Sequence, residues 1–193
     1  MAGRNVEGKL TGKTVVMVVT ARFEDIELLF PILRLAEEGA RCVVVPIGGS
    51  AERPVTGMIG HTVPIQVMAE GDRYVVEKLE EISADSVDCL FFPGGYSPDG
   101  LRLNQDVLAL VKECHAKGKI VAAICHGPWV LISAGLMKGR KATGYAAVRD
   151  DCINAGAEWV DAPAVRDGNI VTGRVPDDLP ELCREITKAL SEG

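Results

Sequence analysis

A cysteine and a histidine stand side by side at the end of a short apolar run, where a strand is expected to give way to a helix. The run from Ile120 to Ile124 holds only apolar residues, which is typical of a strand buried on both faces of a parallel sheet. Pro128 fits the first turn of a helix, because its missing N–H is not needed there. Cys125 and His126 are therefore expected at a strand–helix junction.

A thiol at such a junction can act as a nucleophile. Free cysteine has a pKa of roughly 8.5, and a helix N-terminus or a cationic neighbour lowers it to about 3.5–7.5. The spacing predicts Cys125 as the candidate nucleophile with a lowered thiol pKa, and His126 or a carboxylic acid as its proton partner. A small, buried and unreactive cysteine is the alternative that these residues alone leave open.

The elements that must position this junction alternate between apolar strands and amphipathic helices. This alternation predicts a single-domain α/β fold, flavodoxin-like and doubly wound, with a mainly parallel sheet and helices on both faces. Residues 1–13 are expected to form a flexible N-terminal arm, and residues 14–193 the α/β domain. The expected strands are 14–20, 41–46, 88–93 and 120–124, with a hairpin over 165–172; the expected helices follow Asp25, Asn104, Pro128 and Pro180, and another covers about 148–155.

The segment 48–83 carries weaker signals than the rest of the chain. Residues 62–68 alternate like an edge strand, and residues 73–82 fit a strand or a helix. Asp25 is expected to cap the helix that begins beside it.

The composition bounds the possible partners. The 193 residues carry a net charge of -6, which argues against nucleic acid or an anionic membrane as the main partner. No run approaches 18 apolar residues, so neither secretion nor membrane insertion is expected. The three histidines lack zinc-ligand spacing, so no metal is expected. Six cysteines without a CxxC pair predict reduced thiols and a cytoplasmic location: Cys42, Cys89, Cys114, Cys125, Cys152 and Cys183.

Several motifs together resemble one protein family. Ala-Ile-Cys-His-Gly-Pro around Cys125, followed by Leu-Ile-Ser-Ala-Gly and Gly-Arg-Lys-Ala-Thr, closely resembles the nucleophile elbow of the PfpI family. These proteins are intracellular cysteine hydrolases of the class I glutamine amidotransferase-like superfamily. Asn-Ala-Gly-Ala-Glu-Trp-Val-Asp and Arg-Val-Pro-Asp-Asp-Leu-Pro are similar to the family as well. The resemblance spans roughly residues 14–190 and is weakest over 48–83.

The resemblance implies roles for further residues. Glu24, in the motif Phe-Glu-Asp, would approach the sulfur as a protonated carboxyl group. The N–H groups of Gly95 and His126 would form an oxyanion hole. Asp99 would orient the histidine across a subunit contact, although it is one methylene shorter than the glutamate of the peptidase branch. From the residues alone, Glu24 and Asp99 are also interpretable as solvated surface acids.

The function implied is that of a cofactor-independent cysteine hydrolase. Its substrates would be reactive dicarbonyls such as methylglyoxal and glyoxal, or their protein adducts, as in glyoxalases and deglycases. An intracellular cysteine peptidase and a non-enzymatic oxidative-stress sensor or chaperone are the alternatives. Carbonyl chemistry is favoured because attack on an aldehyde needs no leaving-group acid, whereas amide hydrolysis needs a well-oriented histidine. The family also implies self-association as a dimer or hexamer.

Overall fold

The computed structural model describes residues 7–50 and 52–192 of the chain. Within these residues, seven strands form the main sheet in the order β10-β11-β7-β6-β1-β2-β5, and all neighbours are parallel except β10 and β11. The strands are β1 (Thr14–Val19), β2 (Arg41–Pro46), β5 (Val75–Val76), β6 (Cys89–Phe92), β7 (Ile120–Ile124), β10 (Ala164–Asp167) and β11 (Ile170–Gly173).

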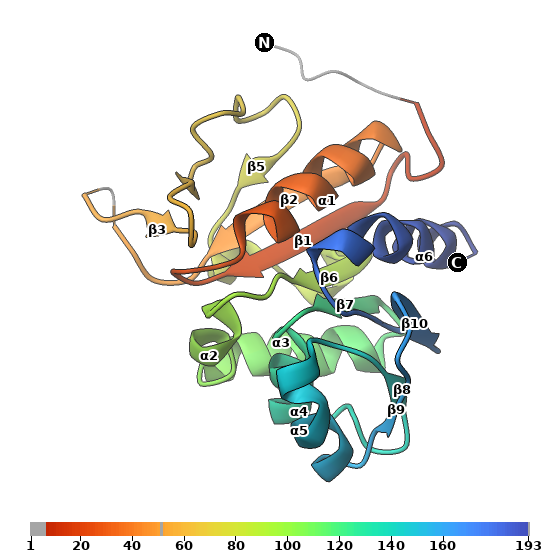
Figure 1. Ribbon diagram of the computed structural model, residues 1–193. Helices are drawn as coiled ribbons and strands as arrows, with labels where there is room; N and C mark the ends of the chain where they lie inside the picture. Colours follow the sequence, from red (N-terminus) through yellow and green to blue (C-terminus); the bar gives the residue numbers. More distant parts are fainter. Residues whose placement is uncertain (1–6, 51, 193) are drawn as a thin grey trace.

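Helices cover both faces of the main sheet, as Figure 1 shows. Because neighbouring side chains of a strand point to opposite faces, Met17 of β1 joins one core while Val16 and Val18 join the other. No helix among the described residues is both long and apolar enough to cross a membrane. One face carries α1 (Asp25–Glu37) and α6 (Leu179–Ser191), and the other α3 (Gln105–Ala116), α4 (Pro128–Ser133) and α5 (Arg149–Asn154).

The predicted fold class is confirmed, with a mainly parallel sheet between two helical layers. The four expected strands occur as β1, β2, β6 and β7, and the expected hairpin is β10 and β11. Asn104 caps α3 as predicted, since its side-chain oxygen accepts hydrogen bonds from the N–H groups of Asp106 and Val107 at 3.0 and 3.1 Å.

The segment 48–83 contains less regular structure than its patterns predict. The expected edge strand over 62–68 is reduced to β4 (Thr62–Val63), which pairs with β3 (Val55–Thr56). Residues 73–82 hold the short strand β5 and then one 3₁₀ turn. The remaining short elements are η1 (Leu79–Glu81), η2 (Ala84–Ser86), α2 (Ser97–Leu101), β8 (Lys141–Ala142), η3 (Ala146–Val148), β9 (Glu158–Trp159) and η4 (Pro176–Asp178).

The described part of the predicted arm is packed against the domain. Leu10 is fully buried, and its N–H donates to the carbonyl oxygen of Glu38 at 2.7 Å. Gly8 lies so close to the same residue that an added Cβ would come within 2.3 Å of that oxygen. Residues 7–13 therefore belong to the domain, because burying Leu10 removes apolar surface from water. Residues 1–6 of the predicted arm lie outside the described residues.

Asp25 does not cap α1, contrary to the prediction. Its side chain is fully buried and instead holds the loop between β3 and β4. Its carboxylate accepts hydrogen bonds from the N–H groups of Ile59 and His61 at 2.9 and 3.0 Å, and its Oδ1 lies 2.8 Å from His61 Nδ1. A contact this distant in sequence leaves no local signal, so the helix-start pattern alone suggested a cap.

Replacing Asp25 by alanine is expected to destabilise the protein, because it leaves these buried donors without an acceptor. The free energy of unfolding should fall by at least about 2 kcal/mol, measured by denaturant titration. Asp72→Ala replaces an exposed acid in the segment 48–83 and should change the free energy of unfolding by less than about 0.5 kcal/mol. Equal stabilities of the two variants would contradict the assigned role of Asp25.

Candidate active site

Cys125 lies at a sharp turn between β7 and α4, where the backbone takes an unusual conformation. Its φ is +59°, a left-handed value that residues other than glycine rarely adopt. Two hydrogen bonds hold this residue: its N–H donates to Gly173 O at 3.1 Å, and the N–H of Tyr145 donates to Cys125 O at 2.9 Å. The surrounding loops therefore enforce a strained backbone at the candidate nucleophile, which is common at functional sites.

The turn lies where the connections of the sheet diverge. From β1 the chain proceeds to β2 on one side, whereas β6 leads to β7 on the other. Open α/β sheets bind ligands at such a switch point, beyond the carboxyl ends of the strands. The loops after β1, β6 and β7 meet there, which brings residues 22–27, 94–99 and 125–129 together.

Gly95, soon after β6, brings a backbone N–H to the sulfur. Its φ is +69°, and an added Cβ would lie 2.5 Å from the nitrogen of Glu24, so a side chain does not fit without a backbone shift. Interactions with the backbone N–H groups of Gly95 and His126 lower the pKa of the Cys125 thiol. The structure thus brings these three residues together. Two N–H donors that converge in this way can stabilise an oxyanion.

The carboxyl group beside the sulfur belongs to Glu27, not to Glu24. Glu27 is fully buried, and its Oε2 accepts a hydrogen bond from the N–H of Gly94 at 2.7 Å. An added Cβ on Gly94 would lie 2.7 Å from that oxygen and 2.5 Å from Cys125 Cβ, which shows how closely the three groups pack. Glu24 is only partly buried, at the N-cap position of α1.

Helix geometry explains why Glu27 takes the place expected for Glu24. Glu27 shares the buried face of α1 with Pro31 and Leu35, at a spacing of four residues. Glu24 precedes the first turn of the helix, at the N-cap position, where its side chain stays partly exposed. An acid on an otherwise apolar helical stripe is the signal in the sequence that identifies Glu27.

Burial governs the protonation of this carboxyl and thiol. Burial, with a smaller contribution from the charge of Glu24, raises the pKa of Glu27 to about 8, although hydrogen bonds from Gly94 and Cys125 oppose the shift. Burial and the charge of Glu27 likewise raise the pKa of Cys125 to about 12. The two groups therefore do not both carry a negative charge near neutral pH.

The predicted lowering of the thiol pKa is therefore wrong for this structure. The two N–H donors do lower it, but burial and the neighbouring carboxyl group outweigh them. The six-residue helix α4 is also short, so its N-terminal dipole contributes little. Attack by the sulfur thus requires a base that takes up the thiol proton.

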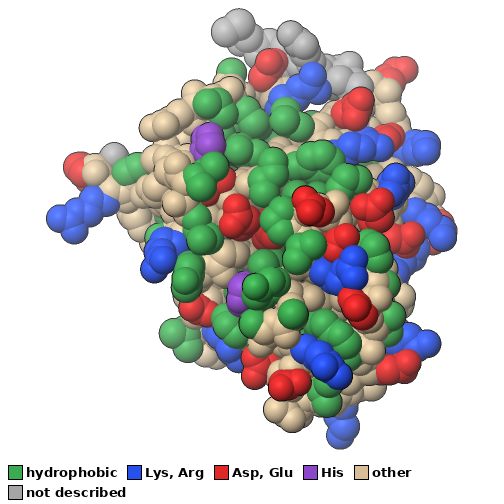
Figure 2. All heavy atoms as spheres, in the orientation of Figure 1, with side chains coloured by type: hydrophobic (Ala, Val, Ile, Leu, Met, Phe, Trp, Pro, Cys, Tyr) green, Lys and Arg blue, Asp and Glu red, His purple; other side chains and the backbone are tan. Residues whose placement is uncertain are grey.

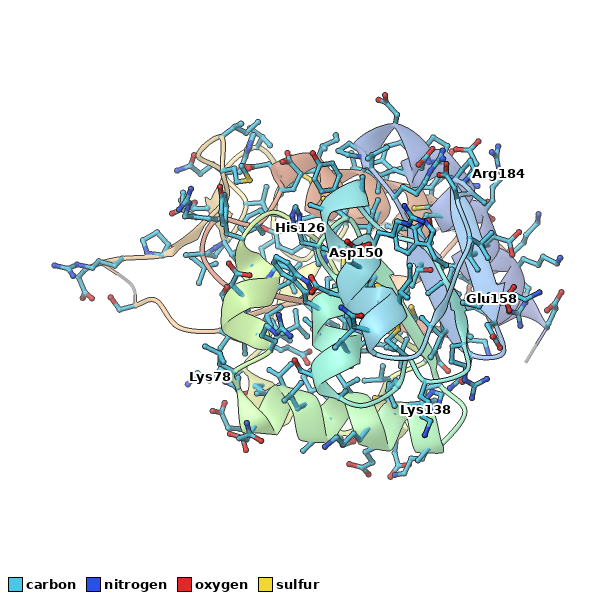
Figure 3. The ribbon with its side chains drawn as sticks, turned by 60° about the horizontal axis from the view of Figure 1, so that its bottom comes forward. Lys78, His126, Lys138, Asp150, Glu158 and Arg184 are labelled. Carbon is cyan, nitrogen blue, oxygen red and sulfur yellow. The ribbon has the colours of Figure 1, made fainter. Side chains whose placement is uncertain are left out.

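His126 is placed to act as that base. Its Nδ1 lies 3.2 Å from Cys125 Sγ. Burial lowers the pKa of His126, against a smaller opposing effect of Asp99, so the imidazole is neutral at pH 7. Figure 3 shows His126 well apart from the labelled Lys78 and Lys138, which therefore supply no charge next to it.

Asp99 lies on the exposed side of α2. Its charge reaches His126, because it raises the pKa of that imidazole. Within the part of the chain that the structure describes, no hydrogen bond joins the two side chains. The described residues also contain no group of three or more His, Cys, Asp or Glu that could hold a metal ion.

The chain is similar in sequence to known proteins over most of its length. A model of the DJ-1/PfpI family matches residues 13–189. The chain is 42% identical over 176 residues to a deglycase of Pyrococcus abyssi, covering 91% of this chain and 98% of that protein. It is 40% identical over 178 residues to a Bacillus subtilis protein with a provisional cysteine protease name, covering 92% of this chain and 98% of that protein.

A solved structure shares the fold. It is a two-domain protein from Anabaena variabilis with DJ-1/ThiJ/PfpI-like and ferritin-like domains, matched with a TM-score of 0.79 and 33% identity. The match covers 92% of this chain and 48% of the other, so this chain spans about half the length of that protein.

Because the Glu27 carboxyl is buried, we expect the stability of the protein to depend on pH. The Glu27→Gln variant should lack this dependence. Between about pH 4.5 and 8 the folded protein keeps a proton on Glu27 that the unfolded chain has released, so stability falls as pH rises through this window. The limiting slope from this group is about 1.4 kcal/mol per pH unit. Relative to the wild type, the Glu27→Gln variant should therefore gain stability from pH 5 to pH 8, measured by denaturant unfolding.

The matched control is Glu24→Gln, whose partly exposed carboxyl should produce a smaller change over the same pH range. Parallel pH profiles of wild type and Glu27→Gln would show that the Glu27 carboxyl does not titrate as its burial requires.

Proposed function

The chain belongs to the DJ-1/PfpI family, and from this we propose that it is a cofactor-independent cysteine hydrolase with Cys125 as nucleophile. Its substrates are reactive dicarbonyls such as methylglyoxal, or the adducts that they form on proteins. The observation that carries the proposal is the grouping of Cys125 with a neutral imidazole, a buried carboxyl of raised pKa and two converging N–H donors. Relatives that are named deglycases support the same substrate class.

The first step is addition of the thiol to the aldehyde carbon. The S–H proton moves to His126 Nδ1, the sulfur electron pair forms the C–S bond, and the π electrons of the carbonyl move to its oxygen. The N–H groups of Gly95 and His126 then donate to this oxyanion. Return of the proton from His126 to this oxygen gives a neutral hemithioacetal, and no leaving group departs.

The second stage moves a hydrogen between the two carbons of the substrate. A base removes the proton from the sulfur-bearing carbon, and an acid returns a proton to the former ketone carbon, which leaves a thioester of the hydroxy acid. Glu27 suits both roles because its pKa of about 8 lies close to neutral pH. Water then cleaves the thioester, releasing lactate from methylglyoxal and restoring the thiol.

The position of Asp99 favours this chemistry over peptide hydrolysis. Cleaving an amide requires a histidine that is oriented to protonate the leaving amine, and among residues 7–50 and 52–192 no carboxylate is hydrogen-bonded to His126. We propose that an orienting acid matters only if a second copy of the chain brings its own Asp99 to the site, as the dimers or hexamers of the family imply. Peptidase activity, which the name of the Bacillus relative suggests, is the competing function.

The decisive assay is lactate formation from methylglyoxal by the purified protein without added cofactor. Cys125→Ala is expected to abolish it. Glu27→Gln should lower kcat by roughly 10²–10⁴-fold, since a positioned acid or base contributes about that much. Glu24→Gln is the matched control and should lower kcat by less than about tenfold.

Turnover that persists in Cys125→Ala would refute the nucleophile. A complete absence of turnover, together with Cys125-dependent cleavage of a peptide substrate, would replace the carbonyl hydrolase by a peptidase. A larger loss in Glu24→Gln than in Glu27→Gln would return the proton-transfer role to Glu24.

A further inference from the structure

Two aromatic rings from different segments lie next to the imidazole of His126. The Trp129 ring, in the first turn of α4, has its centroid 5.0 Å from that of His126, and the centroid of the Tyr145 ring lies 5.1 Å away. Both separations fall within the range of attractive aromatic pairs. The planes of the Trp129 and Tyr145 rings are tilted by 59° and 37° to that of the imidazole, and both rings limit the space into which it can turn.

Trp129 is itself fixed by neighbours outside the site. Its Nε1–H donates to Asp151 Oδ2 of α5 at 2.8 Å, a hydrogen bond strengthened by the carboxylate charge. The guanidinium of Arg102 lies over the indole, 5.5 Å from its centroid, and Arg102 Nε also donates to Ser133 Oγ at 3.0 Å. The indole therefore has partners at its edge and on its face, which restrict it to one orientation.

Tyr145 is tied to the nucleophile through the main chain, because its N–H donates to the carbonyl oxygen of Cys125. Tyr145 is thus hydrogen-bonded to the backbone of the elbow, whereas the orientation of Trp129 depends on its hydrogen bond to α5. Next to these rings, His126 Nδ1 lies 3.2 Å from the sulfur. Without Trp129, rotation of the His126 side chain would carry Nδ1 away from Cys125.

We propose that Trp129, fixed by Asp151, is a positioning residue that holds His126 Nδ1 at proton-transfer distance from Cys125 Sγ. The inference rests on the proposed function in one respect, that His126 takes up the thiol proton. Proton transfer is sensitive to such placement, since a displacement of about 1 Å can reduce a rate by roughly 10²-fold. Trp129 acts through His126 and has no chemical role of its own.

The chain supplies its own control for the loss of a tryptophan. It contains two tryptophans, and both are partly buried against the same hydrophobic core. Trp159 lies in β9, which follows α5 in the sequence. Its ring does not contact the imidazole of His126. Trp159→Leu therefore measures the effect of lost packing alone, against which Trp129→Leu is judged.

The first experiment tests contact between the indole and His126 in solution. In Trp159→Phe, Trp129 is the only tryptophan, and its fluorescence should be quenched when the adjacent imidazole becomes protonated. Emission is expected to fall on acidification with a midpoint below pH 6.5, because burial lowers the pKa of His126. The step should disappear when His126→Gln is added. A pH-independent emission, or a step that survives His126→Gln, would overturn the contact.

The second experiment measures positioning by the rate at which iodoacetamide alkylates Cys125 as a function of pH. Trp129→Leu should slow alkylation at pH 7 by roughly 10- to 100-fold, approaching the rate of His126→Gln, whereas Trp159→Leu should change it by less than about twofold. Trp129→Phe keeps an aromatic ring but not the hydrogen bond to Asp151, so its alkylation rate should lie between those of Trp129→Leu and Trp159→Leu. Asp151 is exposed, so Asp151→Ala removes only its hydrogen bond with Trp129. This variant tests the proposal even if Trp129→Leu folds poorly.

Turnover provides an independent readout. If methylglyoxal is a substrate, Trp129→Leu should lower kcat by a similar factor and change KM by less than about twofold. Rates of alkylation for Trp129→Leu and Asp151→Ala within twofold of Trp159→Leu would overturn the proposal. If the wild-type protein does not turn over methylglyoxal, only the proposed function fails. The alkylation and fluorescence experiments still decide the role of Trp129.

Discussion

The structure depends on the burial of two acidic groups, the Cys125 thiol and the Glu27 carboxyl, in one small space at the carboxyl end of the sheet. Burial raises the pKa of both groups, and the charge of Glu27 raises that of the Cys125 thiol further, whereas the hydrogen bond from Cys125 partly lowers the pKa of Glu27. Glycine at position 94 is required because any side chain there would strike both groups. The strained turn at Cys125 and the Gly94-Gly95 corner together place these two groups next to each other.

A buried thiol with a raised pKa is a poor nucleophile by itself, and the rest of the site compensates for this. In the proposed mechanism, His126 is a neutral base 3.2 Å from the sulfur, and the N–H groups of Gly95 and His126 donate hydrogen bonds to the charge that forms. In that mechanism the reactivity of Cys125 depends on geometry more than on its resting ionisation. This dependence gives the neighbours of His126 their importance.

The face around the site combines apolar and acidic side chains, as Figure 2 shows across the centre of the molecule. Its exposed apolar residues near the elbow include Tyr96 and Tyr145, which are 50% and 41% exposed. The Arg22 guanidinium stacks over the Tyr96 ring at 4.0 Å.

The sequence by itself determined the fold class, the hairpin, the cap at Asn104 and the strand–helix junction at Cys125, because each is written in residues close together in the chain. The sharp turn at Gly94-Gly95 is local in the same way, whereas the oxyanion-hole roles of the Gly95 and His126 N–H groups came from the resemblance to the PfpI family. Only the tertiary structure decided that Glu27 replaces Glu24, that Asp25 binds a loop instead of capping a helix, and that the thiol pKa rises. Burial and hydrogen bonding by segments distant in the chain control these properties, and no local pattern records which segments will meet.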